Sequence, residues 1–263
     1  MKFKKNMILV VLLVAPILLT GSFKLFSQET MNIHKTDNSV LTVPLSEIEK
    51  ITYGKSVQDL PILSENTVTD IDGNVYNTVK IGTQTWLQSD LKVTKFNDGT
   101  PIALIQDNKL WGKTTAAAYC WYDNKNPEPN SPYGAIYNGY AASMKTLCPK
   151  GWHVPTKEEF DVLPKSCGSM ALDAARGLRE VGTIHWKETT TSVTNKTGFT
   201  ALPTGHRRSY GDFNFRGGSG NWWSSTIKDD SKLLFSLNIL TYYNLNYLSK
   251  NWGGCVRCIK DEY

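Results

Sequence analysis

The hydrophobic pattern begins with an uninterrupted apolar segment, residues 7–19, which follows three lysines and precedes a few small residues. Basic residues, a short apolar segment and small residues in this order are typical of a secretory signal peptide. The segment is shorter than the ~20 residues that a transmembrane helix needs. We predict that residues 1–27 are a signal peptide, cleaved after Ser22 or after Ser27. The alternative is an uncleaved N-terminal anchor, which is the only membrane association that we expect.

Residues 28–66 follow a different pattern. Short extended runs lie between Met31 and Leu45 around a Thr-Asp-Asn turn, and the apolar residues of 48–53 predict a further strand. Residues 58–67 carry few signals and indicate a linker. A piece of fewer than ~40 residues is too small to bury a core of its own. We therefore expect a short N-terminal β segment and linker that lean on the larger domain or on another protein.

The main domain, residues 67–263, opens with strand-like alternation. Apolar residues share one face over 75–81, and Gly82-Thr83 separates this run from residues 84–87. Glycine at the first position favours a two-residue hairpin turn of type II′. A further tight turn is predicted at Asp98-Gly99.

Helical signals occur in three places. Apolar residues spaced four apart predict a helix over residues 134–145. A capping box of Thr156 with Glu159 predicts a second helix, which Pro164 would limit. A third amphipathic pattern covers residues 169–180. These helices are short and lie in the middle of the chain.

Strand-like runs return at residues 199–202, 233–240 and 256–259, within a polar sequence rich in glycine and aromatic residues. Few helices and many short strands indicate an α+β domain. We expect short strands, two to three helices and long loops, preceded by the small β segment. Loops of this kind carry the surface properties of a domain.

Composition and charge narrow the function. The chain is 40% hydrophobic and 20% charged, which excludes a disordered protein. Its net charge of +5 suggests nucleic acid at first sight. However, residues 1–27 contain four lysines and no acid, so without them the charge is +1. No basic stripe remains, and we expect no nucleic-acid partner.

The five cysteines are Cys120, Cys148, Cys167, Cys255 and Cys258. In an exported protein they favour disulfides, with at least one cysteine unpaired or intermolecular. The last two form a single C-x-x-C without a second pair, and the histidines lack metal-ligand spacing, so we expect no metal and no cofactor.

Six ordered motifs resemble the Fibrobacter succinogenes major paralogous domain family over about residues 69–261. They are Asp70-Ile-Asp-Gly-Asn-Val-Tyr76, Val79-Lys-Ile-Gly-Thr-Gln-Thr-Trp86, Leu147-Cys-Pro-Lys-Gly-Trp-His-Val-Pro-Thr156, Thr197-Gly-Phe-Thr-Ala-Leu-Pro203, Asn221-Trp-Trp-Ser-Ser225 and Val256-Arg-Cys258. The resemblance implies a C-type lectin-like fold, related to formylglycine-generating domains, in exported bacterial proteins. It implies no established activity.

The resemblance also implies a disulfide between Cys148 and Cys258, leaving Cys255 to pair with Cys120, with Cys167 or with neither. Formylglycine-generating relatives use a reactive cysteine pair, so a cysteine-dependent oxidase is an alternative function. The copper-site pattern of those relatives is not recognisable in this sequence.

Two motifs resemble calcium sites. Asp70-x-Asp72-Gly73 lacks the later glutamate and the sixth-position glycine of an EF-hand loop, which favours turn chemistry. Glu128-Pro129-Asn130 matches the calcium-bound sugar motif of mannose-type lectins, but it precedes Cys148 and no Trp-Asn-Asp follows. A proline-rich turn is the better interpretation of this segment.

Aromatic residues alternate with asparagines near the C-terminus, a combination that stacks on sugars or forms protein-binding hot spots. Trp222 and Trp223 belong to a motif that resembles a core strand, and we assign at least one of them to the core. Tyr242, Tyr243, Asn244 and Asn246 are the candidate ligand-binding residues, and we expect no catalytic ones.

We therefore expect an exported, non-enzymatic binding domain that recognises a glycan or a protein at the bacterial cell surface. It is expected to be extracellular or surface-bound, with the periplasm left open. A self-associating structural component is the first alternative, and the cysteine-dependent oxidase is the second.

Overall fold

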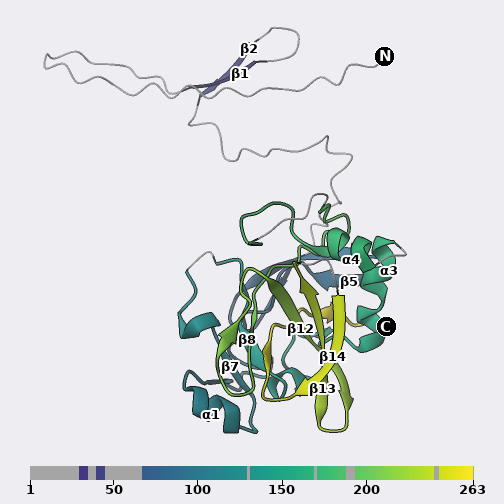
Figure 1. Ribbon diagram of the computed structural model, residues 1–263. Coiled ribbons are helices and arrows are strands. Elements are labelled where there is room, and N and C mark those ends of the chain that lie inside the picture. Colours follow the sequence, from purple (N-terminus) through teal and green to yellow (C-terminus); the bar gives the residue numbers. More distant parts are fainter. Residues whose placement is uncertain are drawn as a thin grey trace, which may run out of the picture. The chain divides into compact units, whose positions relative to one another are not determined.

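The computed structural model describes residues 30–34, 40–44, 67–128, 131–168, 171–187, 193–239 and 243–262 (Figure 1). The chain divides into two compact units, residues 1–59 and 60–263. In the first unit, β1 (Thr30–His34) pairs antiparallel with β2 (Val40–Pro44), which confirms the predicted extended runs, while the predicted turn between them lies outside the described residues. The signal peptide, the strand at 48–53 and the linker lie outside the described residues.

The second unit is built mainly from three sheets. Their strand orders are β3-β4-β5-β16-β9, β11-β10-β15-β8-β7-β6 and β12-β13-β14. The five-stranded sheet comprises β3 (Thr67–Thr69), β4 (Val75–Ile81), β5 (Gln84–Leu87), β16 (Ile259–Lys260) and β9 (Trp152–His153). The six-stranded sheet comprises β11 (Phe213–Asn214), β10 (His206–Arg207), β15 (Gly253–Gly254), β8 (Ile136–Asn138), β7 (Ala118–Cys120) and β6 (Ala103–Leu104). The three-stranded sheet comprises β12 (Ser219–Lys228), β13 (Ser231–Asn238) and β14 (Tyr243–Ser249).

The predicted β4–β5 hairpin is confirmed. Ile81 pairs with Gln84 across the two-residue turn, and Gly82 takes a positive φ of 61° while Thr83 does not. A positive φ at the first turn position alone is the requirement of type II′, which glycine meets without steric cost. The turn at Asp98-Gly99 is also confirmed, since the Gly99 amide donates to the Phe96 carbonyl at 2.8 Å.

Helices are short and few among the described residues: α1 (Asn108–Lys113), α2 (Lys157–Phe160), α3 (Val162–Cys167) and α4 (Ala171–Leu178), with 3₁₀ turns at Tyr122–Asn124 and Ala141–Ser143. The Thr156–Glu159 capping box of α2 is confirmed, and so is the third predicted helix, α4. Pro164 does not end the helical region. It lies in the first turn of α3, where a residue without an N–H loses no helical hydrogen bond.

The helix predicted over residues 134–145 is wrong. This segment forms β8, whose three residues are all buried, and then the 3₁₀ turn Ala141–Ser143. Strand β8 pairs with β7 and β15, and because its side chains are buried on both faces, no polar alternation marks it as a strand. Apolar residues spaced four apart do not distinguish such a strand from a helix.

The expected α+β, C-type lectin-like fold is therefore corrected. The described part of the domain is mostly β: three sheets form its framework and the helices are single short pieces at its periphery (Figure 1). No C-type lectin fold is shown. The sequence overestimated helix because the buried central strands carry no period-two signal.

One C-terminal segment joins the three sheets. Residues 253–254 form β15 of the six-stranded sheet, Cys255 forms a parallel bridge with Trp222 of β12, and residues 259–260 form β16 of the five-stranded sheet. Between them, the Val256 carbonyl accepts from the Leu91 amide at 2.8 Å. The domain depends on this segment because no other described stretch of similar length pairs with all three sheets.

The disulfide Cys148–Cys258 is confirmed, and it closes a sequence separation of 110 residues. Cys120, Cys167 and Cys255 are free and buried. The core of the domain includes Trp86, Trp222 and Trp223, so the assignment of the motif tryptophans to the core is confirmed. Among the described residues, no helix has the length and apolar character to cross a membrane.

Candidate functional site

Residues from three of the sequence motifs meet at a buried ion pair between Asp90 and Arg257. Asp90 Oδ1 accepts from Arg257 Nη2 at 2.5 Å, from Arg257 Nε at 2.8 Å and from Trp222 Nε1 at 2.7 Å. Arg257 also donates to the Phe199 carbonyl and lies 4.2 Å from the Phe199 ring centroid. Both charged side chains are fully buried. The motifs around these residues therefore build the core and leave no room for a ligand there.

The Asp70-x-Asp72-Gly73 motif is a turn, as predicted. Asp70 Oδ1 accepts from the amides of Asp72 and Asn74 at 2.9 and 3.0 Å, and its Oδ2 accepts from Tyr76 Oη at 2.6 Å. Burial, together with this carboxylate, raises the pKa of Tyr76 well above its usual range. The oxygens of Asp70 are occupied by the turn itself.

The candidate Tyr/Asn stretch lies on β14, an edge strand of the three-stranded sheet. Asn244 and Asn246 are exposed, whereas Tyr243 is half-buried with its ring centroid 6.0 Å from that of Phe235. Tyr242 lies outside the described residues. The tyrosine therefore faces the core and the two asparagines face outward, as expected for alternate residues of a strand. Ligand binding by this stretch stays a prediction.

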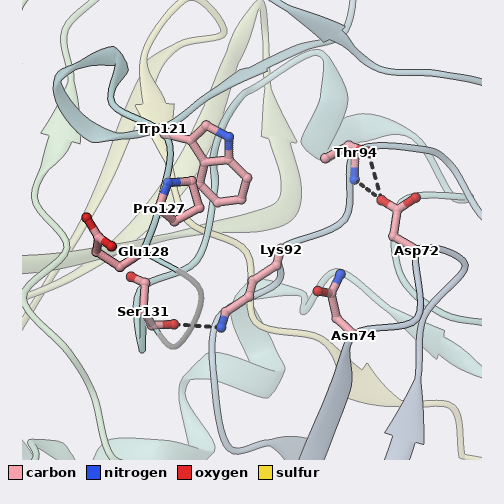
Figure 2. Close-up of a pocket in the computed structure, with 8 residues that line it drawn as sticks. All are labelled: Asp72, Asn74, Lys92, Thr94, Trp121, Pro127, Glu128 and Ser131. Carbon is pink, nitrogen blue, oxygen red and sulfur yellow. Dashed lines mark hydrogen bonds between the residues drawn. The ribbon is translucent and has the colours of Figure 1, made fainter.

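A pocket of about 280 Å³ lies on another part of the domain (Figure 2). We call it the Trp121 pocket. It is lined by Asp72, Asn74, Lys92, Thr94, Trp121, Pro127, Glu128 and Ser131. Three pieces of chain supply these residues: the turn before β4, the segment after β5, and the loop that follows β7. The Trp121 and Pro127 rings lie on the side of the pocket opposite Asp72 and Thr94, and the Lys92 side chain points toward Ser131 (Figure 2).

Hydrogen bonds hold the polar residues of this pocket in place. Asp72 Oδ2 accepts from the Thr94 amide at 2.5 Å and from its hydroxyl at 2.8 Å, and Asp72 Oδ1 lies 3.1 Å from Lys95 Nζ. Burial acts to raise the pKa of Asp72, but these hydrogen bonds and the lysine charge outweigh it and lower the pKa. Lys92 Nζ donates to the Ser131 carbonyl at 2.7 Å.

Two further pockets adjoin the first, because all three share Ser131. The Arg216 pocket, about 190 Å³, is lined by Trp121, Tyr122, Lys125, Asn126, Pro127, Glu128, Ser131, Tyr133, Gly134 and Arg216. The other, about 520 Å³, includes Lys92 and Glu180. We call the three together the groove.

Arginine stacking organises the far end of the groove. Arg216 Cζ lies 4.3 Å from the Tyr133 ring centroid and 5.2 Å from that of Tyr122. Burial raises the pKa of Tyr133, and the charge of Arg216 opposes that rise. His185 packs edge-to-face on Tyr133 and bonds to Glu180 Oε2 at 2.8 Å through Nδ1.

Glu128 belongs to the motif that the sequence interpreted as a proline-rich turn. The Ser131 amide donates to the Glu128 carbonyl at 2.8 Å, which confirms a turn at this point, while Pro129 and Asn130 lie outside the described residues. No group of three or more metal-ligating side chains is found among the described residues.

The free thiols are poor candidates for chemistry. Burial raises the pKa of Cys120 to about 12 and that of Cys167 to about 11, and it raises the pKa of Cys255 as well. Thiols with raised pKa values are weak nucleophiles at neutral pH. Cys258 is held in the disulfide with Cys148, so Cys255 and Cys258 do not form a redox pair in this structure.

Sequence reasoning singled out Asp72 and Glu128, as parts of turns, but missed most other residues of the groove. Lys92, Trp121, Tyr133 and Arg216 are far apart along the chain, and no motif spacing connects them. The only local signal was the stretch 125–133, whose prolines and asparagines indicate a surface loop. Loops held by a rigid sheet are the usual place for binding residues.

The comparisons with known proteins give one finding. The family model described as the Fibrobacter succinogenes major domain matches residues 79–260, more than half of the chain. Searches of curated proteins and of solved structures return no match for this sequence. The chain belongs to the Fibrobacter succinogenes major domain family.

Proposed function

We propose that this domain is an exported, non-enzymatic binding module and that the Trp121 pocket holds a sugar residue of a glycan. The observation that carries the proposal is a half-buried indole ring flanked by hydrogen-bond donors and acceptors in one pocket. A pocket of about 280 Å³ lies near the lower end of small-ligand sites, ~300 Å³. It suits a single small unit rather than a folded partner.

The aromatic wall supports a sugar because its plane is fixed. Trp121 packs edge-to-face on Tyr119, with ring centroids 6.0 Å apart and an interplanar angle of 87°. A ring held in this way presents a large apolar surface at little entropic cost. The C–H face of a pyranose is a flat apolar surface of comparable width.

The polar residues of the pocket support the same class of ligand. Asn74 and Lys92 offer donors, and Asp72 and Glu128 offer acceptors. Sugar hydroxyls donate and accept, so a pocket with both kinds of group around an apolar wall satisfies them. An apolar peptide segment would not use the remaining hydrogen-bonding capacity of these groups.

Export and the absence of catalysis are parts of the proposal. The Cys148–Cys258 disulfide fits an oxidising compartment, as does the signal-like pattern of residues 1–27. In the pocket, Asp72 has a lowered pKa, whereas a general acid at neutral pH needs a raised one. The raised pKa values of the free thiols argue against the oxidase alternative.

The test is binding of the purified domain to a panel of immobilised and soluble polysaccharides. Truncation of an aromatic hot spot costs about 2 kcal/mol or more, so Trp121→Ala is expected to weaken binding at least ~30-fold. The matched control is Tyr247→Ala, another aromatic side chain, 40% exposed and outside the groove. It is expected to bind as the unchanged protein does.

Three results would overturn the proposal. The first is a panel without any bound polysaccharide, and the second is binding that Trp121→Ala leaves unchanged. The third is self-association in sedimentation without saccharide binding, which would favour a structural component instead.

A further inference from the structure

We propose that the groove selects a carboxylate-bearing sugar, such as a uronic acid residue, and that Arg216 binds its carboxylate. This inference rests on the proposed function, because it names the class of glycan that the same groove would take. It comes from the distribution of paired and unpaired charges around the groove.

One of the three carboxylates that line the described groove is paired with a lysine. Asp72 is paired with Lys95 at 3.1 Å and accepts two hydrogen bonds from Thr94. Glu180 Oε2 lies 2.8 Å from His185 Nδ1, a hydrogen-bond distance, and the neutral imidazole leaves the charge of this carboxylate in place. Glu128 forms no ion pair with a described residue, and it is exposed.

The groove's cations are not compensated. Lys92, Lys125 and Arg216 form no ion pair with any carboxylate in the described parts of the chain. Lys92 is half-buried and its ammonium bonds to the neutral Ser131 carbonyl. Three cations without an ion pair face two carboxylates without a permanently charged partner, Glu128 and Glu180, so the groove has a net positive charge, which attracts an anionic ligand.

Arg216 is the cation best placed to read a carboxylate. Its guanidinium lies over the Tyr133 ring, 4.3 Å from the centroid, and beside that of Tyr122. Contact with two rings holds the guanidinium at this place, and its five N–H donors exceed what one tyrosine hydroxyl can accept, so donors remain for a carboxylate, which a guanidinium can bind in a bidentate way. The side chain is exposed, so a ligand reaches it from solvent.

The Arg216 pocket continues the sugar site. It shares Trp121, Pro127, Glu128 and Ser131 with the Trp121 pocket. A saccharide lying on Trp121 therefore extends toward Arg216 without leaving the groove. Glu128 stands between the two pockets, where its carboxylate accepts from sugar hydroxyls.

The test compares three soluble polysaccharides by affinity electrophoresis and calorimetry: neutral xyloglucan, polygalacturonate and dextran sulfate. We expect the unchanged protein to bind polygalacturonate at least ~10-fold more tightly than the other two. We expect this binding to weaken as the salt concentration rises from 50 to 500 mM, because salt screens the attraction between exposed charges.

The decisive variant is Arg216→Gln, expected to lose that ~10-fold preference while keeping its thermal stability. Its matched control is Arg208→Gln, because Arg208 also lies over a tyrosine, 5.7 Å from the Tyr210 centroid, but is paired with Asp212 at 3.7 Å. Arg208→Gln is expected to leave the preference intact.

The failures of the two proposals are distinguishable. Xyloglucan bound as tightly as polygalacturonate, through Trp121, would overturn the anionic ligand and keep the glycan-binding function. A preference for dextran sulfate would overturn the proposal that the groove selects a carboxylate. Absence of binding to all three would count against the proposed function itself.

Discussion

Arg257 and Arg216 both lie over aromatic rings, and their surroundings differ. Arg257 is fully buried beside Phe199, and its charge is paired with Asp90 at 2.5 Å. Arg216 is exposed over Tyr133 and has no ion pair among the described residues. Burial of a charge demands a partner inside the protein, whereas an exposed charge stays free for an outside one. Burial together with the pairing to Asp90 therefore marks Arg257 as a residue that builds the fold, whereas exposed, unpaired Arg216 is the one that we assign to a ligand.

The largest expected effect is on the buried arginine. Arg257→Met leaves Asp90 buried without its partner, so we expect the free energy of unfolding to fall by about 3–5 kcal/mol in urea denaturation. Arg216→Met is the same substitution at the exposed site, with an expected change within about 0.5 kcal/mol. If the two substitutions lowered the free energy of unfolding equally, the assignment of Arg257 to the fold and of Arg216 to a ligand would be contradicted.

The disulfide adjacent to Arg257 comes next. The double variant Cys148→Ala, Cys258→Ala is expected to lose roughly 2–5 kcal/mol of stability, because the closed loop spans 110 residues. Thermal unfolding with and without dithiothreitol measures it. The reductant should lower the midpoint of the unchanged protein to that of the variant and leave the variant unaffected; a shift in the variant would contradict this.

A substitution at Tyr243 tests whether the β14 residues contribute to stability or to ligand binding. Since its ring packs on Phe235, Tyr243→Ala is expected to cost about 1–3 kcal/mol of stability without changing polysaccharide affinity. Asn244→Ala, at the exposed neighbouring position, is the control and should change neither quantity. If Tyr243→Ala weakened binding more than Trp121→Ala, the β14 stretch predicted from the sequence would be the site, and the groove would not.

The smallest effect concerns pH. His153 bonds to Glu159 and to Asp261, and the hydrogen bond with Glu159 is the main reason why its pKa rises from 6.5 to about 9. A raised pKa stabilises the fold fully below pH 6.5 and ceases to do so as the pH rises through 9.

The difference in stability between the unchanged protein and His153→Gln should follow that window. Because the side chain is 36% exposed, we expect it to stay below about 1 kcal/mol. Urea denaturation at pH 6 and at pH 10 measures the difference. A difference that grows with pH would contradict the assignment.

Parts of the fold followed from residues close together in the chain. The Gly82-Thr83 turn, the capping box of Thr156 with Glu159 and the helix α4 depend on interactions within a few residues. The pairing of Cys148 with Cys258 came from the resemblance to the family, not from spacing. In the turn, the capping box and the helix, the motif and the structural feature are the same short piece of sequence.

Other parts did not follow. Residues 136–138 carry apolar spacing that also suits a helix, and only their place between β7 and β15 makes them a strand. The Asp90–Arg257 pair joins residues 167 positions apart. Propensity and periodicity act over one turn or one strand, so they contain no information on such pairings.

The sequence by itself determined the local turns and caps, the family, the assignment of the motif tryptophans to the core and, through the resemblance, the disulfide. Only the tertiary structure decided that the domain is mostly β and that Lys92, Trp121 and Arg216 line one groove. The physical reason is that a turn is stabilised by neighbours in the chain. A groove arises where separate loops are brought together by the pairing of distant strands.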